Sequence, residues 1–242
     1  EARDFMLRYL PQEVVGLLEA DSLELAKDSF VDKELQERFS DLLYRVKLRS
    51  GRGAYVYVLF EHKSGSEPLI ALHLLRYMVK IWEQWLQQGG VGPLPPIIPW
   101  VVYHGRAEWR PALDLRSLFA PAGALSVFLP DFRYLLCDLS AYSDEAIRGM
   151  VTLRVALLVL KYIFRKDLED RLPGILGLLR ELTARRSGLE YLETVLRYLV
   201  RAADRLSEEG LKRAVEAALS ETGGGIMPPL AEKWIEQGIE QG

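Results

Sequence analysis

The chain has 242 residues, of which 49% are hydrophobic and 27% are charged, and its formal net charge is −3. This length and composition predict one large globular domain, alone or with an appendage, and exclude a wholly disordered chain. The slight acidity excludes a surface coated in positive charge, so a contact with nucleic acid has to come from a local group of Lys and Arg side chains.

Cysteine content and hydropathy indicate the cellular compartment in which the protein works. The single cysteine, Cys137, excludes an internal disulfide framework and a cysteine zinc site, and it fits a reducing compartment. No apolar run reaches the ~18 residues of a membrane span, and no signal peptide is visible. We therefore expect a cytoplasmic protein without a membrane partner.

The spacing of apolar residues, glycine and proline predicts an α/β first half and a helical second half. In chain order we expect a helix at 2–19 that Pro11 breaks or kinks, a strand at 22–31, a hairpin at about 38–63, a helix opened by Ser66 and Pro68 and closed by Gly89 and Gly90, a strand at 97–105, and one or two short strands within 125–130 and 132–140. Four helices are expected at 143–166, 172–186, 188–205 and 207–221.

This order divides the chain into three regions. Residues 1–140 are expected to form a mixed sheet flanked by helices, and residues 141–222 a helical region. Residues 223–242 begin with three glycines and end in a repeated IEQG segment. Glycine at every fourth position lowers helix propensity by ~1 kcal/mol each, so we expect this tail to be frayed or to depend on a partner.

Three charged residues lie on the predicted hairpin, at the end away from its turn. The turn is the segment RSGRG, and centring it on Gly51 places Asp41 directly across from Glu61. Because strand side chains alternate, Lys63 shares the face of Glu61. Two carboxylates and one ammonium at this end predict a divalent-metal site with a charged helper. The alternative is a set of solvated charges at an exposed hairpin end, which the apolar stretch before Glu61 disfavours.

Four blocks of sequence resemble a known family of nucleases. The blocks SFVDKELQERFSDLLYRV, YVLFEHKS, LLRYMVKIWEQW and IPWVVYHG are similar to the recombination-promoting nuclease family, also labelled putative transposases, of the PD-(D/E)xK nuclease superfamily. The match covers most of residues 2–165 and includes the glutamine-glycine tail. The resemblance implies an α/β fold with a restriction-endonuclease-like core and a helical C-terminal half. It also implies a bacterial, metal-dependent DNA endonuclease that promotes recombination or DNA mobility.

The resemblance assigns roles to the residues of the hairpin end. Asp41 matches the family's metal-binding Asp, Glu61 the Glu of the ExK motif, and Lys63 its Lys, where many relatives carry Gln. Mg²⁺, or Mn²⁺ in its place, would be held by Asp41, Glu61 and the backbone carbonyl of His62. Lys63 would orient the attacking water or neutralise developing charge. The family usually begins with a His-Asp…Phe-Lys segment ahead of Glu1 that this sequence lacks, which implies lower activity if that segment shapes the site.

Two groups of basic residues are candidates for contacts with DNA phosphates. They are Arg45, Lys47, Arg49 and Arg52 on the hairpin, and His73, Arg76 and Lys80 on the helix that follows. Each group has an alternative interpretation, as a solvated turn and as the solvated face of an amphipathic helix.

Two other functions stay open at this point. The chain could be a catalytically silent DNA-binding or protein-assembly module that keeps the nuclease fold, which a metal titration distinguishes from a nuclease. It could also be a non-enzymatic interaction protein whose helical half and tail recruit partners, which a pull-down with and without residues 226–242 tests. A homo-oligomer formed through the helical C-terminal region or the tail is also open.

Overall fold

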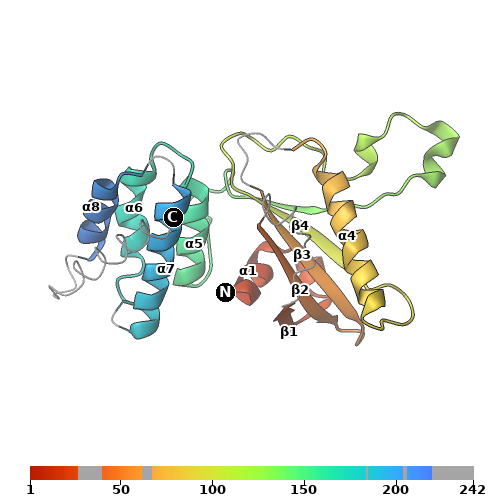
Figure 1. Ribbon diagram of the computed structural model, residues 1–242, viewed down its shortest axis with the longest axis horizontal. Helices are drawn as coiled ribbons and strands as arrows, with labels where there is room; N and C mark the ends of the chain where they lie inside the picture. The colour runs from red at the N-terminus through yellow and green to blue at the C-terminus, as the bar shows by residue number, and fades with distance from the viewer. Residues whose placement is uncertain (27–39, 62–66, 184, 204–205, 220–242) are drawn as a thin grey trace. The chain divides into compact units, whose positions relative to one another are not determined.

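The computed structural model describes residues 1–26, 40–61, 67–183, 185–203 and 206–219. The chain forms two compact units, one of residues Ala2–Ala141 and one of Glu1 with Tyr142–Gly242. The first unit contains a sheet and the second is helical, as Figure 1 shows. The α/β fold class with a helical C-terminal part is therefore confirmed. Among the described residues, no helix has both the length and the apolar character needed to cross a bilayer.

The first unit begins with two short helices and an edge strand. Pro11 interrupts the expected helix, which becomes α1 (Ala2–Tyr9) and the single turn α2 (Gln12–Val15). Strand β1 (Leu18–Leu25) follows and starts four residues earlier than predicted. Residues 18 and 19 are therefore extended, because their backbone pairs with the next strand and this pairing outweighs local apolar periodicity. The part of the predicted strand beyond residue 26 lies outside the described residues.

Five strands form one mixed sheet. After β1 come β2 (Ser40–Leu48), β3 (Gly53–Glu61), β4 (Ile97–Tyr103) and β5 (Leu135–Asp138), and their order in the sheet is the order in the chain. The first three strands are antiparallel, whereas β3, β4 and β5 are parallel. The carboxyl ends of three parallel strands therefore meet at one edge of the sheet.

Helix α4 (Ile70–Gln87) connects β3 to β4 and covers one face of the sheet (Figure 1). Alternate residues of β3, among them Tyr57 and Leu59, pack with Leu74 of this helix in the main apolar core. The helix ends as predicted at the Gly89–Gly90 pair. Gly89 has φ +87, and the amide of Gly90 donates to the carbonyl of Trp85 at 2.9 Å, which is the hydrogen bond of a Schellman cap.

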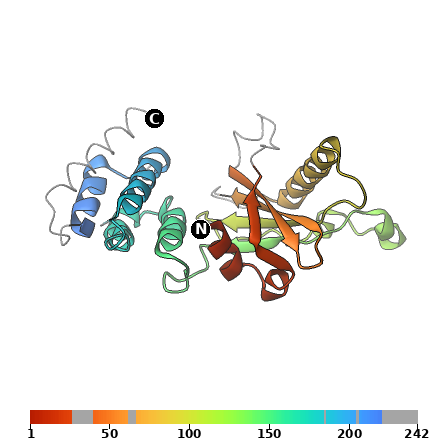
Figure 2. The same ribbon diagram turned by 90° about the horizontal axis from the view of Figure 1, so that it is seen from below.

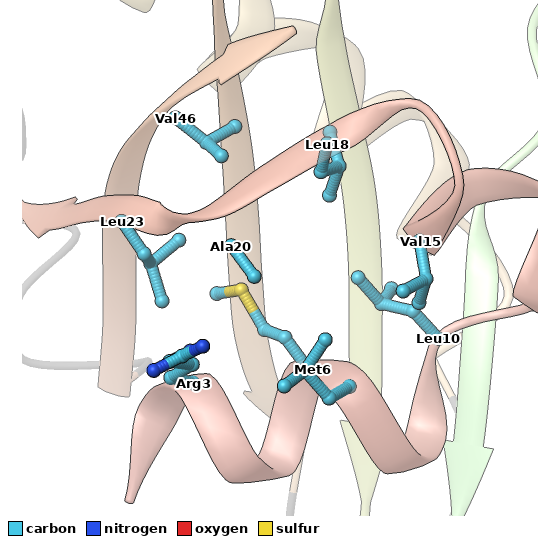
Figure 3. Close-up of a pocket in the computed structure, with 9 residues that line it drawn as sticks. Arg3, Met6, Leu10, Val15, Leu18, Ala20, Leu23 and Val46 are labelled. Atoms are coloured by element: carbon cyan, nitrogen blue, oxygen red, sulfur yellow. The ribbon is translucent and has the colours of Figure 1, made fainter. Parts of the chain in front are cut away.

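The opposite face of the sheet receives α1. The ring of Phe5 stacks on the ring of Trp100 with centroids 4.5 Å apart. Met6 and Leu10 line a small apolar cavity beneath β1 (Figure 3). Arg3 lies at one end of this cavity and forms a 2.6 Å ion pair with Asp21. The amphipathic character of α1 thus fixes it on the face of the sheet that α4 leaves uncovered.

The connection from β4 to β5 contradicts one predicted element. A strand was expected within residues 125–130, but this segment lies largely in the 3₁₀ helix η2 (Gly123–Phe128), which follows the shorter η1 (Arg116–Leu118). Leu125, Val127 and Phe128 are all exposed, so they do not form a core-facing row. Both views show this connection extending away from the sheet (Figure 2). An apolar run without a neighbouring strand to pair with does not form a β-strand.

The described residues of the second unit form four helices. They are α5 (Val151–Tyr162), α6 (Leu168–Gly177), α7 (Arg186–Ala202) and α8 (Glu208–Leu219). The helical character of this region was predicted, but α5 begins eight residues later than expected. The tail beyond residue 219, including the IEQG repeat, lies outside the described residues.

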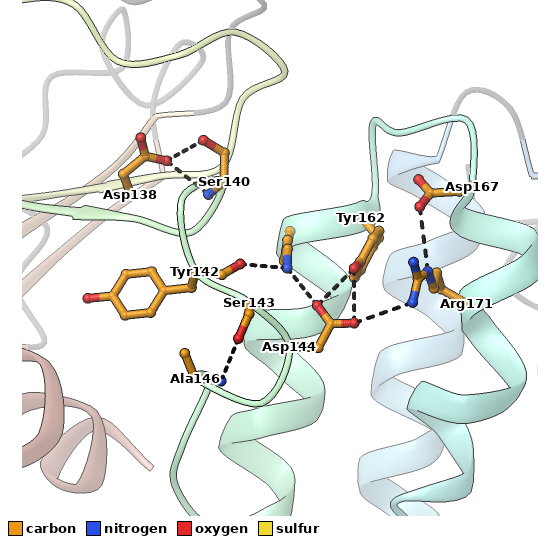
Figure 4. Close-up of polar contacts among 10 residues, drawn as sticks. Asp138, Ser140, Tyr142, Ser143, Asp144, Ala146, Tyr162, Asp167 and Arg171 are labelled. Carbon is orange, nitrogen blue, oxygen red and sulfur yellow. Dashed lines mark hydrogen bonds and ion pairs between the residues drawn. The ribbon is translucent and has the colours of Figure 1, made fainter.

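A polar cluster explains why residues 143–150 do not join α5. The ammonium of Lys161 donates to Asp144 Oδ1 at 2.6 Å and to the carbonyl of Tyr142 at 2.8 Å. The hydroxyl of Tyr162 donates to both oxygens of Asp144, at 2.8 and 2.9 Å (Figure 4). These contacts hold the segment across the end of α5. The segment is thereby kept in a turn by partly buried hydrogen bonds.

Candidate active site

The hairpin turn sets the register on which the predicted site depends. The amide of Gly51 donates to the carbonyl of Leu48 at 2.8 Å, and Gly51 has φ +81. This is a turn followed by a left-handed glycine, a common three-residue hairpin loop in which glycine is the last residue and not the central one. Asp41 consequently pairs with Leu59 and not with Glu61. The predicted direct opposition of Asp41 and Glu61 is therefore wrong by two residues.

A shift of two residues changes the neighbour but not the face of the sheet. Side chains alternate with period two, so the strand positions of Leu59 and Glu61 face the same side. The register position of Asp41 belongs to that side, diagonally across from Glu61 at ~7–8 Å. The backbone therefore keeps the two acidic positions close enough for one metal ion to lie between them. His62 and Lys63 lie outside the described residues, so their predicted roles stay predictions.

Glu61 itself is wholly buried, with 0% of its surface exposed. It is the last residue of β3, at the carboxyl end of the parallel part of the sheet. This edge is where α/β proteins place ligands and catalytic groups. Burying a carboxylate at this position does not stabilise the fold by itself, because removing a charge from water costs free energy. The burial of Glu61 therefore suggests a functional role.

Two further polar residues extend Glu61 into a row. Glu61 pairs with Tyr103 on β4, and Tyr103 pairs with Asp138 on β5. Residues paired directly across strands share a face, so this row lies on the side of the sheet that α4 covers. The carboxylate of Asp138 accepts hydrogen bonds from the amide and the hydroxyl of Ser140, at 2.9 and 2.6 Å (Figure 4). This turn fixes Asp138 at the strand end.

Tyr103 is held as a neutral group between the two acids. Burial raises its pKa, the charge of Asp138 raises it further, and Glu61 adds a smaller effect, against a lowering by the hydrogen bond to Ala107. The hydroxyl donates that bond to the carbonyl of Ala107 at 2.7 Å, and the ring meets Trp109 edge-on with centroids 5.0 Å apart. Tyr103 is therefore a rigid neutral spacer and not a proton acceptor at neutral pH.

Sequence reasoning missed Asp138. The available signal was an acidic residue directly after a short apolar run, in the segment LLCDLS. That signal becomes informative only when the run is known to be parallel to the strand of Glu61, because parallel strands bring their carboxyl ends together. Among the described residues no group of three Asp, Glu, His or Cys side chains forms a metal site. The side chain of Asp41 is not among those described, so the pairing of Asp41 with Glu61 at a metal ion stays a prediction.

The basic residues of the hairpin lie away from the acidic edge. Arg45 pairs with Tyr55 and Lys47 with Gly53, near the start of β3. At ~3.3 Å per residue, Arg45 is ~20 Å along the sheet from Glu61. Arg49 and Arg52 lie in the exposed turn, one step further. These side chains therefore do not adjoin the predicted site. An extended ligand could still contact them and the acidic edge at the same time.

A surface pocket of about 300 Å³ lies beside these cations. It is lined by Arg45 and Lys47 from β2, by Glu24 from β1 and by Trp85 from α4. One guanidinium nitrogen of Arg45 is 3.4 Å from the amide oxygen of Gln88. The pocket carries both signs of charge and an aromatic wall, at the far end of the sheet from Glu61.

Helix α4 carries the other predicted contacts. It begins nine residues after Glu61, so His73 lies nearest to the acidic edge, and Arg76 and Lys80 follow along the helix. Nδ1 of His73 lies 3.7 Å from the carboxylate of Glu67. Arg76 is exposed and Lys80 is half-buried. The structure thus places these three residues in a line that leads from the acidic edge toward the hairpin turn.

Taken together, the mixed sheet, the covering helix and the acidic carboxyl edge define an α/β domain of the nuclease-like class. The family model described as "Putative transposase, YhgA-like" matches residues 1–190. The chain therefore belongs to this family.

Several curated proteins of Escherichia coli are similar to the chain. The recombination-promoting nuclease RpnD is 36% identical over 182 residues, which cover 74% of this chain and 68% of that protein. The recombination-promoting nuclease RpnA is 34% identical over 169 residues, covering 69% of this chain and 56% of that protein. RpnE, named an inactive recombination-promoting nuclease-like protein, is 31% identical over 207 residues, covering 84% of this chain and 66% of that protein. No solved structure matches the chain.

Proposed function

We propose that the chain is a metal-dependent DNA endonuclease that hydrolyses phosphodiester bonds. The observation that carries the proposal is the wholly buried carboxylate of Glu61, at the carboxyl end of β3 and diagonally across from the position of Asp41. The names of RpnD and RpnA support a nuclease role for the family, and the mixed sheet flanked by helices is consistent with the PD-(D/E)xK superfamily that the sequence resembles.

The donor set at this edge suits a hard divalent cation. Asp41 and Glu61 supply carboxylate oxygens, and the backbone carbonyl of His62 would supply a third oxygen. Mg²⁺, with Mn²⁺ as a substitute, prefers such oxygen ligands and keeps several of its waters. When bound, the ion makes a water more acidic and stabilises negative charge on the phosphate.

The protein's own residues would divide the remaining work. Lys63 would orient the attacking water and offset charge that develops on the phosphate as the P–O bond breaks. Asp138 is held by Ser140, and burial together with the charge of Asp138 keeps Tyr103 protonated, so both residues would be fixed polar groups beside Glu61. The DNA backbone would be held by the basic residues of the hairpin and by His73 and Lys80 on α4, and such contacts position a duplex without reading its sequence.

A nicking assay tests this proposal. Supercoiled plasmid is incubated with the purified chain and Mg²⁺ or Mn²⁺, beside the variants Asp41→Ala and Glu61→Gln. Glu13→Gln, which changes an exposed carboxylate on α2, is the matched control. We expect the parent and the control to nick the plasmid and both site variants to lose at least about a hundredfold in rate, the scale of removing a charge that stabilises the transition state. Equal nicking by Asp41→Ala and the parent would refute the assignment.

The second candidate function is a catalytically silent module that keeps the fold and binds DNA or assembles with proteins. It is favoured by one observation, that RpnE and YjiP, both similar to this chain, carry names that describe them as inactive. DNA binding by the parent that needs no metal, together with the absence of nicking under every metal condition, would select this function over the nuclease.

A further inference from the structure

Helix α4 has a second apolar surface, on the side that faces away from the sheet. Leu69, Leu72, Val79 and Leu86 are each between 41% and 53% exposed, although the same helix buries a full apolar face in the core. Three of these residues repeat at intervals of seven, at positions 72, 79 and 86. Residues seven apart lie above one another on a helix, so they form a continuous stripe along its length.

The stripe is part of a wider pattern typical of helix pairing. Between its members lie Leu75 and Trp82, which are only partly buried against the core. Together the five residues follow a heptad pattern in which both seam positions are apolar. Such a pattern predicts packing against a second helix, because a purely solvated face would carry polar residues at these positions.

Two charges beside the stripe make the surface self-complementary. Arg76 lies three residues before Val79 and Glu83 lies four residues after it, on the same side of the helix. Within the described part of the chain, neither forms an intramolecular ion pair. A two-fold axis crossing the helix beside Val79 would place Arg76 of one copy within one residue of the level of Glu83 in the other, within reach of these long side chains, and would do so twice. The same operation would bring Leu72 to Leu86.

We propose that α4 is the interface of a homodimer, in which the α4 helices of two copies pack antiparallel about an axis at Val79. Opposite charges on either side of the axis can pair with each other when two copies of this helix meet. This favours a second copy of the chain over an unrelated partner, because binding to an unrelated partner does not require a symmetric arrangement of charges. DNA is a poorer occupant of the stripe, because it would desolvate Glu83 and four aliphatic side chains against phosphates. An 18-residue helix is about 27 Å long, so a contact between two copies of this helix alone is a small interface, and we expect a weak dimer.

Self-association is measured by sedimentation equilibrium on the whole chain without DNA or metal. We expect the parent to dimerise within the micromolar range. Arg76→Glu alone, and Glu83→Arg alone, should each weaken the dimer about tenfold or more, since each places like charges together at two symmetric places. Mixing the two variants should restore association between them, because the acidic and basic copies are then complementary. A role of Arg76 in binding DNA would give no such rescue.

The matched control is Phe128→Ser, which removes an exposed apolar side chain of η2 outside the stripe and should leave the dimer unchanged. Circular dichroism is used to check that the α4 variants keep the helical signal of the parent. Val79→Glu, at the axis, should give a folded monomer. A monomeric parent throughout the micromolar range would overturn the proposal. So would a dimer that the single charge variants leave intact, or mixed variants that fail to associate.

Discussion

Asp144 is expected to be the most stabilising single carboxylate of the helical unit. The substitution Asp144→Ala removes the partner of Lys161, whose side chain is only 5% exposed and whose ammonium lies 2.6 Å from the carboxylate. It also removes the acceptor of the hydroxyl of Tyr162. Breaking a buried pair from one side costs about 3–5 kcal/mol, because the remaining charge stays buried. The side chain of Asp144 is 30% exposed, so water can partly replace it.

We therefore expect a loss of about 2–3 kcal/mol in the free energy of unfolding, which is below the range for a fully buried pair because water reaches Asp144. The assay is urea unfolding of the whole chain, followed by helical circular dichroism. Arg171→Ala is the control from the same cluster, since Arg171 is 53% exposed and lies 3.8 Å from Asp144. Exposed pairs contribute at most about 1 kcal/mol. The double variant Asp144→Leu/Lys161→Met should be more stable than Asp144→Ala, because it leaves no unpaired charge.

The pH dependence follows from the same contacts. Burial alone would raise the pKa of Asp144, but hydrogen bonds from Lys161 and Tyr162, together with the nearby positive charges, lower it overall. Because the pKa of Asp144 is lower in the folded state, its ionised carboxylate stabilises the fold at pH values above the unfolded pKa of about 3.9. This stabilisation is lost as the pH falls through the pKa of the folded state. Asp144→Asn should flatten this acid-dependent loss. If Asp144→Ala costs no more than Arg171→Ala, the cluster is not what stabilises this unit.

Three other predictions concern the first unit. Glu61→Gln should leave the melting temperature unchanged or slightly raised in the absence of metal, since it removes a buried charge; a large drop would mean that Glu61 is a structural residue. The Arg49→Ala/Arg52→Ala double variant should reduce the salt slope of DNA affinity by ~1 for each phosphate that the chain no longer binds, equally for different sequences, and an unchanged slope would make the turn a solvated surface. Asp138→Asn should lower the pKa of Tyr103, seen by tyrosinate absorbance against a Tyr103→Phe blank, whereas an unmoved titration would show that the two residues do not interact.

The hairpin shows how far local sequence can fix a site. Apolar stretches on either side of a glycine-containing turn located both strands. Because strand side chains alternate with period two, the shared face of Asp41 and Glu61 survived an error of two residues in register. The register itself depended on the backbone conformation of Gly51, which closes the loop in the left-handed region. A glycine in a short loop can occupy several positions of different turn types, so the letters alone did not distinguish them.

Other features depended on contacts between distant parts of the chain. Strand β1 begins at Leu18 because β2 pairs with it, and residues 143–150 stay outside α5 because Lys161 holds Asp144. Asp138 became a candidate only when β5 was seen to run parallel to β4. Each of these depends on a partner far away in sequence, whereas helix α4 was predicted well because its end is encoded locally by two glycines.

The central claim is that Asp41 and Glu61 together hold one divalent ion that cleavage requires. Calorimetric titration of the whole chain with Mn²⁺, without DNA, tests it most directly, with Glu13→Gln as the control. The account predicts one bound ion per chain in the parent and the control, and a large loss of affinity in both Asp41→Ala and Glu61→Gln. Binding that is equally strong in all four proteins would place the metal elsewhere and contradict the account.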